Sequence, residues 1–285
     1  MRTCNDHGLG WHRDLPDIRD RSAATESVAR LLAKSAPLRK ALKATPKSVD
    51  LRASCSPIES QGNLNSCTAN AGVGMLEYFE RRAFGKHLDA SRLFLYKATR
   101  RLIGFTTDDG AYLRDTMKAL VLFGVPPESY WPYVETKVNN EPDAFCYAYA
   151  QNYQAIEYYR LDPANSTGAA TLGKLKATLA AGLPAMFGFT VYSSIPPMGD
   201  GKGEVPYPLA GDKVEGGHAV LAVGYDDSKK IGAYKGALLI RNSWGTNWGV
   251  AGYGWLPYAY VEAGLATDFW SMVRAEFVDS DLFKA

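Results

Sequence analysis

The chain has 285 residues, of which 46% are hydrophobic and 22% charged, an ordinary balance for a globular protein of one large domain or two lobes. A net charge of +2 gives no electrostatic reason to expect binding to nucleic acid or to an acidic membrane surface. No stretch predicts a transmembrane helix, and the polar N-terminus lacks the apolar core of a secretory signal. We therefore expect a protein that is cytoplasmic or exported by a route that does not read such a signal.

Neither the cysteines nor the histidines are spaced as metal ligands. The histidines form no HExxH or HxxxH pair, and the cysteines form neither a CxxC pair nor a dense disulfide framework. We therefore expect no metal and no other cofactor. The cysteines are Cys4, Cys55, Cys67 and Cys146.

Residues 1–47 read as a segment distinct from the rest of the chain. Residues 1–22 are rich in Asp, Arg, Gly and Pro and show no sustained period, which predicts an extended or looped strap. Residues 23–44 have a helical pattern that is broken at Pro37, and residues 45–47 read as a linker. The segment is either a stabilising arm or a cover for an active-site cleft, and the two roles are compatible.

Residues 48–150 are predicted to form a mainly helical lobe. Residues 91–102 and 110–124 each carry an apolar face at helical spacing. An earlier helix begins near Thr68 and ends at Gly85, a suitable C-terminal stop. Its buried face is expected to comprise Ala69, Val73, Leu76, Phe79 and Ala83.

Cys67 falls in the first turn of this earlier helix, after Asn65 or Ser66 as the N-cap. The unpaired N–H groups and the positive end of the helix dipole favour a thiolate over a thiol there. Cys67 is therefore a candidate nucleophile. The alternative is a buried cysteine that packs as a small apolar side chain, and the helix pattern alone leaves both open.

Residues 151–285 are predicted to form a β-rich lobe. A helix is expected at residues 171–182, and the apolar runs around it read as strands. The chain is therefore expected to have an α+β fold in two lobes. The predicted strands are residues 155–161, 184–192, 219–225 and 237–243.

The last two predicted strands bring a histidine and an asparagine together. In an antiparallel hairpin of simple register, pairing Tyr225 with Lys235 also places His218 opposite Asn242. The asparagine side chain then accepts a hydrogen bond from one imidazole nitrogen and turns the other toward a cleft. A satisfied histidine at a strand end beside a turn asparagine is the alternative interpretation of this pair.

Three motifs resemble those of the papain-like cysteine peptidases. Residues 242–253, NSWGTNWGVAGY, have every fixed position of the family's asparagine motif NSWGxxWGxxGY. Residues 61–68 resemble its nucleophile motif QGxCGSCW, and GGHAV at residues 216–220 resembles its histidine motif. The motifs occur in the family's chain order and, with the resemblance around them, cover residues 49–277.

The region before the nucleophile resembles a bacterial branch of this family, whose members carry QGxLGSC and a strap similar to GLGWxxDLPDxRD. Residues 8–20 match that strap. Three positions depart from the family pattern. Leu64 stands where many members have a disulfide cysteine, Asn65 replaces the usual glycine, and Thr68 replaces the usual tryptophan.

The resemblance implies a papain-like two-lobed fold, with a helical left lobe, a β-barrel-like right lobe and the active site in the cleft between them. It implies an endopeptidase that hydrolyses peptide bonds through a thioester. Cys67 would be the nucleophile, and His218, held by Asn242, the acid and base. Gln61 would supply the oxyanion hole together with the backbone N–H of Cys67.

The substrate-binding set is also taken from the resemblance. Asp109, Gly110 and Tyr112 resemble the loop that holds an extended substrate, although Asp and Gly at a helix start are as good an interpretation. Gly217 and Trp244 complete the set, and Trp244 would also shield the histidine from water. The expected partner is a protein or peptide substrate, bound by a monomer.

The N-terminal segment resembles a short propeptide, which would make the chain a zymogen whose residues 8–20 cross the cleft and limit access to it. Two alternatives to an endopeptidase stay open. One uses the same thiol for deamidation, transpeptidation or exopeptidase trimming. The other is a catalytically inactive papain-like scaffold that binds a partner, which is disfavoured because all four chemical groups are present.

Overall fold

The structure, a computed structural model, describes residues 7–277, so Cys4 lies outside it. The helices are α1 (Glu26–Lys34), α2 (Ala36–Lys43), α3 (Cys67–Phe84), α4 (Arg92–Leu102), α5 (Leu113–Leu122), α6 (Ala144–Ala150), α7 (Gly168–Ala180) and α8 (Tyr258–Glu262). Two short 3₁₀ helices are η1 (Arg52–Ser54) and η2 (Glu135–Lys137). The strands are β1 (Trp11–His12), β2 (Ser48–Asp50), β3 (Ala111–Tyr112), β4 (Tyr153–Arg160), β5 (Ala185–Tyr192), β6 (Val214–Ile231), β7 (Tyr234–Arg241), β8 (Tyr253–Pro257) and β9 (Ala266–Phe277).

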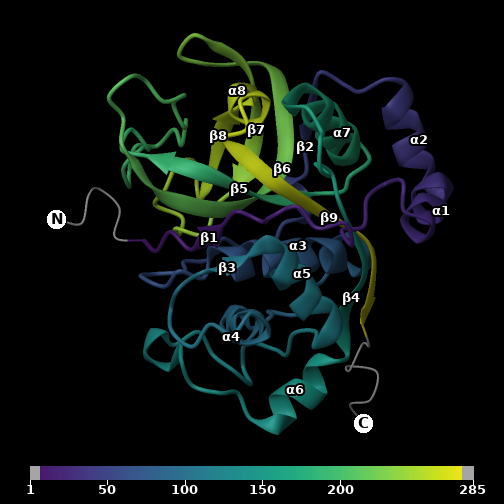
Figure 1. Cartoon of the computed structure of the whole chain (residues 1–285), viewed down its shortest axis with the longest axis vertical. Helices are drawn as coiled ribbons and strands as arrows, with labels where there is room; N and C mark the ends of the chain where they lie inside the picture. Colours follow the sequence, from purple (N-terminus) through teal and green to yellow (C-terminus); the bar gives the residue numbers. More distant parts are fainter. Residues whose placement is uncertain (1–6, 278–285) are drawn as a thin grey trace.

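An antiparallel sheet separates two hydrophobic cores. Successive side chains of a strand point to opposite faces, so Leu221 and Val223 of β6 pack with α3, whereas Val220 and Ala222 pack with α7 and α8. Helices α3 to α6 lie on one side of the sheet (Figure 1), and the part of the N-terminal segment that contains β1 passes between the sheet and these helices. The α+β fold with a helical and a sheet-built half is therefore confirmed.

The sheet is open, so the expected barrel-like closure of the β-rich lobe was wrong. Its strand order is β4-β9-β5-β6-β7-β8, with β2 also paired to β6. Each end is covered by a loop and not by the opposite end. The backbone of Trp255 in β8 bonds Gly203 and Val205, and the backbone N–H of Arg160 in β4 donates to Arg21. Loop residues thus form the backbone hydrogen bonds with β8 and β4 that these edge strands would form with each other in a closed barrel.

Helix α3 ends at Gly85, whose φ of 72° lies in the left-handed region, as the sequence predicted. Residues 67–78 are buried on every face and not only along one stripe, because α3 lies between the sheet and helices α4 and α5. Ala83, expected on the buried face, is exposed. Among residues 7–277 no helix has the length and apolar character needed to cross a membrane.

The β6–β7 hairpin has a different register from the predicted one. Tyr225 pairs with Leu238, not with Lys235, and the pairing shifts between Ala222 and Gly224 and again beyond Asp226. The strands continue to Ile231 and Tyr234, through residues that lie between the predicted strands 219–225 and 237–243. These irregularities add residues to one strand, which a simple register cannot anticipate.

Candidate active site

Cys67 is the first residue of α3, and its side chain is completely buried. Its thiol receives hydrogen bonds from the backbone amides of Ala219, on β6, and of Gly10, in the N-terminal segment. Burial nevertheless raises the pKa of Cys67 to about 11. The thiolate expected from the helix position is therefore not the favoured form in this arrangement, because desolvation outweighs the helix terminus and the amide donors.

His218 is held by Asn242, as the sequence predicted in spite of the altered register. The ring nitrogen Nε2 lies 2.7 Å from the side-chain oxygen Oδ1 of Asn242, and both side chains are buried. The backbone N–H of Ser243 donates to the same oxygen at 2.8 Å, which fixes the orientation of the amide. Nε2 therefore carries the proton, and within residues 7–277 the buried Nδ1 has no hydrogen-bond partner.

Trp244 covers this pair. Its ring stacks on the imidazole of His218 with a centroid distance of 4.5 Å, and the ring of His7 stacks on the same indole at 5.6 Å. Water is thus kept from the imidazole on the side of the indole. Burial is also the main cause that lowers the pKa of His218, to about 4.

Gln61 directs its side-chain amide toward the start of α3. Its Oε1 accepts from the hydroxyl of Ser243 at 2.6 Å, and its Nε2 donates to the carbonyl of Leu64 at 2.8 Å. Nε2 also donates to the carbonyl of Gly8 at 3.0 Å. A carbonyl oxygen of the N-terminal segment therefore occupies the donor that was expected to bind an oxyanion.

The strap, residues 7–22, runs through the site. The carbonyl of Gly10 accepts from the backbone N–H of Ala111 at 2.8 Å, and β1 pairs in parallel with β3. Gly10 also forms a bridge with Gly217 on the other side. A Cβ on Gly8 or on Gly10 would lie within 2.2 Å of the backbone of residues 64 and 65, so only glycine permits this close approach.

The expected substrate-binding residues all lie along the strap. Asp109 accepts from the His12 imidazole through its backbone oxygen, and Tyr112 packs against the same ring at 5.4 Å. A Cβ on Gly110 would come within 2.2 Å of the carbonyl of Gly10, and one on Gly217 within 2.4 Å of the carbonyl of Trp11. Trp244 contacts His7 as described. These residues therefore line one continuous path past Cys67.

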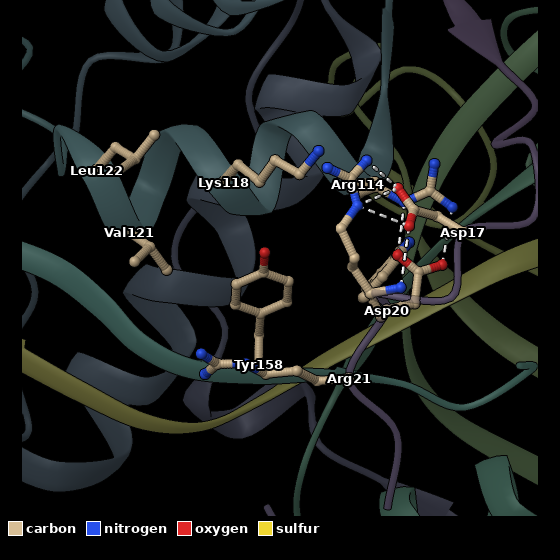
Figure 2. Close-up of a pocket in the computed structure, with 10 residues that line it drawn as sticks. Asp17, Asp20, Arg21, Arg114, Lys118, Val121, Leu122 and Tyr158 are labelled. Atoms are coloured by element: carbon tan, nitrogen blue, oxygen red, sulfur yellow. Dashed lines mark hydrogen bonds and ion pairs between the residues drawn. The ribbon is translucent and has the colours of Figure 1, made fainter. Parts of the chain in front are cut away.

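Beyond the thiol the strap is fixed by buried ion pairs, which we call the clasp (Asp14, Asp20, Arg114 and Arg160). Figure 2 shows Asp20 facing the guanidinium of Arg114, with which it makes a two-bonded pair at 2.6 and 2.7 Å. Arg160 lies 3.2 Å from the same carboxylate. Between the clasp residues, Leu15 and Ile18 remain exposed, so the strap is anchored at separate points and not along its whole length.

Comparisons with known proteins identify the family to which this site belongs. Residues 45–272 match the sequence model of the papain family of cysteine proteases. The chain belongs to this family of hydrolases. It is 34% identical over 215 residues to an uncharacterized peptidase C1-like protein of Acanthamoeba polyphaga mimivirus, covering 74% of this chain and 67% of the viral protein. It is 30% identical over 218 residues to cathepsin K of Gallus gallus, but covers only 58% of that protein.

Among solved structures, the papain-family chain resembles Xylellain, a cysteine protease from Xylella fastidiosa. The TM-score is 0.76 at 35% identity, and the match covers 98% of this chain and 99% of the other. The similarity therefore includes most of the N-terminal segment. The expected resemblance to a bacterial branch of the papain family is confirmed.

The papain-family pattern departs at Asn65, and the structure gives this residue a role. The side chain of Asn65 donates to the backbone oxygen of Asp108 at 2.6 Å, and its backbone N–H donates to the Asp108 carboxylate. Asn65 thus ties the loop before the nucleophile to the loop before Gly110. Thr68, the other change beside Cys67, is buried, and its hydroxyl lacks a hydrogen-bond partner among the described residues.

Three residues of the papain-family site, Trp11, Ser243 and Asp268, were not assigned a role by the sequence. The indole N–H of Trp11 donates to Asp268 at 3.2 Å, and Ser243 orients Gln61 as described. The signal for Asp268 was a single acid within the apolar run ATDFWSMV. Trp11 follows closely after Gly8 and Gly10, and glycines so placed are typical of a close approach between backbones.

Burial of His218 predicts a pH-dependent stability. Its pKa of about 4 lies below the ordinary 6.5, so between these values the unfolded chain binds a proton that the folded chain does not. The neutral imidazole therefore contributes about 3 kcal/mol to the free energy of unfolding. This contribution is fully present above pH 6.5 and is lost as the pH falls through 4. Urea unfolding of the wild type and of His218→Gln should show stability curves that converge over this range; parallel curves would contradict the assignment.

Proposed function

We propose that this chain is a cysteine endopeptidase that hydrolyses peptide bonds through a thioester and is held inactive by its own strap. One observation carries the proposal. The Gln61 amide donates to the Gly8 carbonyl of the strap, and the Gly10 amide of the strap reaches the Cys67 thiol. The thiol is also reached by the amide of Ala219, the residue that follows His218 of the His218–Asn242 pair. A peptide backbone thus already lies where a substrate backbone would bind.

Catalysis begins once the strap is displaced and the cleft becomes hydrated. Hydration lowers the pKa of Cys67 and raises that of His218, because the desolvation that opposed both charges is relieved. The thiol proton then moves to Nδ1 of His218, and the thiolate attacks the scissile carbonyl carbon. The resulting oxyanion accepts from Nε2 of Gln61 and from the backbone N–H of Cys67.

The intermediate collapses as His218 gives its proton to the leaving amine, which leaves an acyl thioester on Cys67. A water molecule then loses a proton to His218 and attacks the thioester carbonyl. Expulsion of the sulfur, which takes the proton back, regenerates the thiol and releases the carboxylic acid. Throughout, Asn242 keeps Nδ1 turned toward the sulfur by holding Nε2–H.

Inhibition by the strap follows from the same contacts. While Gly8 and Gly10 occupy the cleft, no substrate carbonyl reaches Gln61, and burial keeps both catalytic groups neutral. Only molecules whose strap is displaced turn over substrate, so the observed activity is proportional to the fraction of molecules in that state. The clasp residues set the fraction because they hold the strap beyond the thiol.

Digestion of a peptide mixture in ¹⁸O-labelled water, followed by mass spectrometry, tests the proposed reaction. We expect internal peptide bonds to be cut and one ¹⁸O atom to enter each new carboxyl group. Joined peptides would indicate transpeptidation, a mass change at glutamine or asparagine would indicate deamidation, and loss of terminal residues only would indicate an exopeptidase. An unreacted mixture from protein whose Cys67 is nevertheless labelled by iodoacetamide would favour the inactive scaffold, because the thiol is then accessible.

Gln61→Ala is expected to lower peptide hydrolysis by about 10²- to 10³-fold, because one donor to the oxyanion is lost. Because Gln61 also contacts the strap, its loss changes access to the site as well as the oxyanion hole. The rate of hydrolysis is therefore divided by the rate at which iodoacetamide labels Cys67, which corrects for access. Labelling requires access to the thiol but no oxyanion hole. Asn63→Ala, an exposed change in the same loop, is the matched control. A ratio unchanged in Gln61→Ala would exclude the assigned role.

A further inference from the structure

A cavity lies between helices α1 and α2 of the N-terminal segment and helix α7, which packs against α2. Figure 1 shows α1 and α2 beside α7 at the edge of the molecule. The cavity has a volume of about 440 Å³, which is within the range of pockets that hold small molecules. None of the four candidate catalytic residues lines it. The cavity is therefore separate from the candidate active site.

The walls of the cavity are mainly apolar. Leu32 and Leu38 contribute from the two N-terminal helices, and Leu161 contributes from the loop after β4. Leu38 and Leu161 are buried, whereas Leu42, near the end of α2, lines the cavity and is 67% exposed. A hydrocarbon group that entered the cavity would cover this side chain, and such burial of apolar surface is favourable.

The polar groups inside the cavity already have partners within the protein. The hydroxyl of Tyr159 lies 3.4 Å from Oγ1 of Thr178, and this Oγ1 donates to the backbone oxygen of Lys174 at 2.8 Å. The guanidinium of Arg160 is paired with the carboxylates of the clasp and of Asp268. These groups need no polar atom from a ligand, so the enclosed part of a ligand is expected to be hydrocarbon.

The charge at the cavity is positive. Apart from Arg160, the charged side chains that line it are Arg39 and Lys174, and no Asp or Glu does so. Both are exposed, and neither has a carboxylate partner among residues 7–277. The surrounding residues 23–47 contain six basic side chains and one acidic one. An anionic group at the mouth of the cavity would complement these charges.

The small exposed apolar area favours a single hydrocarbon chain over a larger partner. Leu42 is the one large apolar side chain of α1 and α2 that is exposed. A helix that binds a membrane surface buries a whole apolar face in it. A docking surface for a protein usually presents a contiguous apolar patch of several hundred Å². Leu42 and the cavity below it provide neither.

We propose that this cavity binds a long-chain carboxylate. Its hydrocarbon chain lies between α1, α2 and α7, and its carboxylate lies at Arg39 and Lys174. The site is apart from the cleft, so the proposal does not depend on the peptidase activity proposed above. Because the ligand binds the folded chain, it should also raise the temperature of unfolding.

Isothermal titration calorimetry of the full-length protein with octanoate, decanoate, dodecanoate and tetradecanoate, each below its micelle concentration, tests the proposal. We expect one molecule per chain and an affinity that rises about fourfold for each buried CH₂ group until the cavity is filled. Dodecanol lacks the charge and should bind about fivefold more weakly than dodecanoate, and dodecyltrimethylammonium more weakly still. Equal affinities of the three dodecyl compounds, or no binding of any carboxylate, overturn the proposal.

Two variants locate the ligand. Arg39→Gln with Lys174→Gln should weaken dodecanoate binding about fivefold and leave dodecanol binding unchanged. Both residues are exposed, so the fold should be retained, and Lys40→Gln, an exposed change on α2 that does not line the cavity, is the matched control. Ala29→Phe places a ring in the cavity and should abolish binding of both compounds, with thermal unfolding measured in parallel. Wild-type binding in the double variant and in Ala29→Phe overturns the proposal.

Sedimentation with vesicles distinguishes a free carboxylate from an anionic membrane surface. The probes are vesicles of phosphatidylcholine with and without phosphatidylglycerol. We expect the protein to stay in the supernatant with both. Sedimentation with the anionic vesicles, which Lys40→Gln weakens as much as the double variant does, would assign the basic side chains to a membrane surface and overturn the proposal.

Discussion

Cys67→Ala is expected to lower kcat/KM for peptide hydrolysis by about 10⁵-fold, the largest effect of any single substitution considered. The reaction loses its nucleophile, and neither Gln61 nor His218 can form the thioester in its place. The substitution removes only a sulfur atom that is fully buried, so the fold should be retained. Hydrolysis of a fluorogenic peptide, with thermal unfolding measured in parallel, checks the result.

The matched control for Cys67→Ala is Cys146→Ala. Cys146 is also a free, buried cysteine, but it lies in α6 and not at the cleft, so its loss should leave hydrolysis unchanged. An active Cys67→Ala protein would show that another group performs the chemistry. Equal losses in the two variants would indicate damage to the fold and not to the site.

Trp11→Ala is expected to raise kcat/KM of the full-length chain by about 10²-fold, the second large effect. Burial of the indole and its bond to Asp268 anchor the strap in the cleft, and truncating a buried tryptophan typically costs about 3–5 kcal/mol. That loss is sufficient to shift the strap from mostly bound to substantially displaced. The measurement is hydrolysis of a peptide mixture together with the rate of Cys67 labelling.

Ile18→Ala provides the control for Trp11→Ala, because Ile18 belongs to the same strap but is fully exposed. This change should leave both rates unaltered. If Trp11→Ala behaves like the control while remaining folded, the strap is a stabilising arm and not a cover of the active site.

The candidate catalytic groups could be predicted from the sequence because each lies in a motif that resembles the papain-family pattern. The helix start at Cys67 and the ends of the apolar runs at His218 and Asn242 left other interpretations open, and the resemblance favoured the catalytic one. Their hydrogen bond was predicted correctly although the register was wrong. The side chains of His218 and Asn242 reach across the offset that the bulges introduce between β6 and β7. Their hydrogen bond therefore forms although the strand register differs from the predicted one.

Properties that depend on distant parts of the chain could not be predicted in the same way. The raised pKa of Cys67 depends on its burial in the folded chain, where residues as distant in sequence as Gly10 and Ala219 surround the sulfur. The pairing of Trp11 with Asp268 joins residues 257 positions apart and relies on a bulge in β9. Whether the edge strands of the sheet pair with each other or with loops likewise depends on which loops reach them. The hydrophobic periodicity of the strands does not indicate this.

The most direct test of the account is the pH dependence of Cys67 alkylation by iodoacetamide, followed by mass spectrometry in the wild type, Trp11→Ala and Trp11→Ala with His218→Ala. We predict slow labelling in the wild type and fast labelling in Trp11→Ala. Labelling of Trp11→Ala should persist well below pH 8, because a displaced strap allows the thiolate–imidazolium pair to form. Removal of His218 should return the profile to that of an ordinary thiol. Equal rates in all three proteins, each titrating as an ordinary thiol, would contradict both the catalytic pair and its cover.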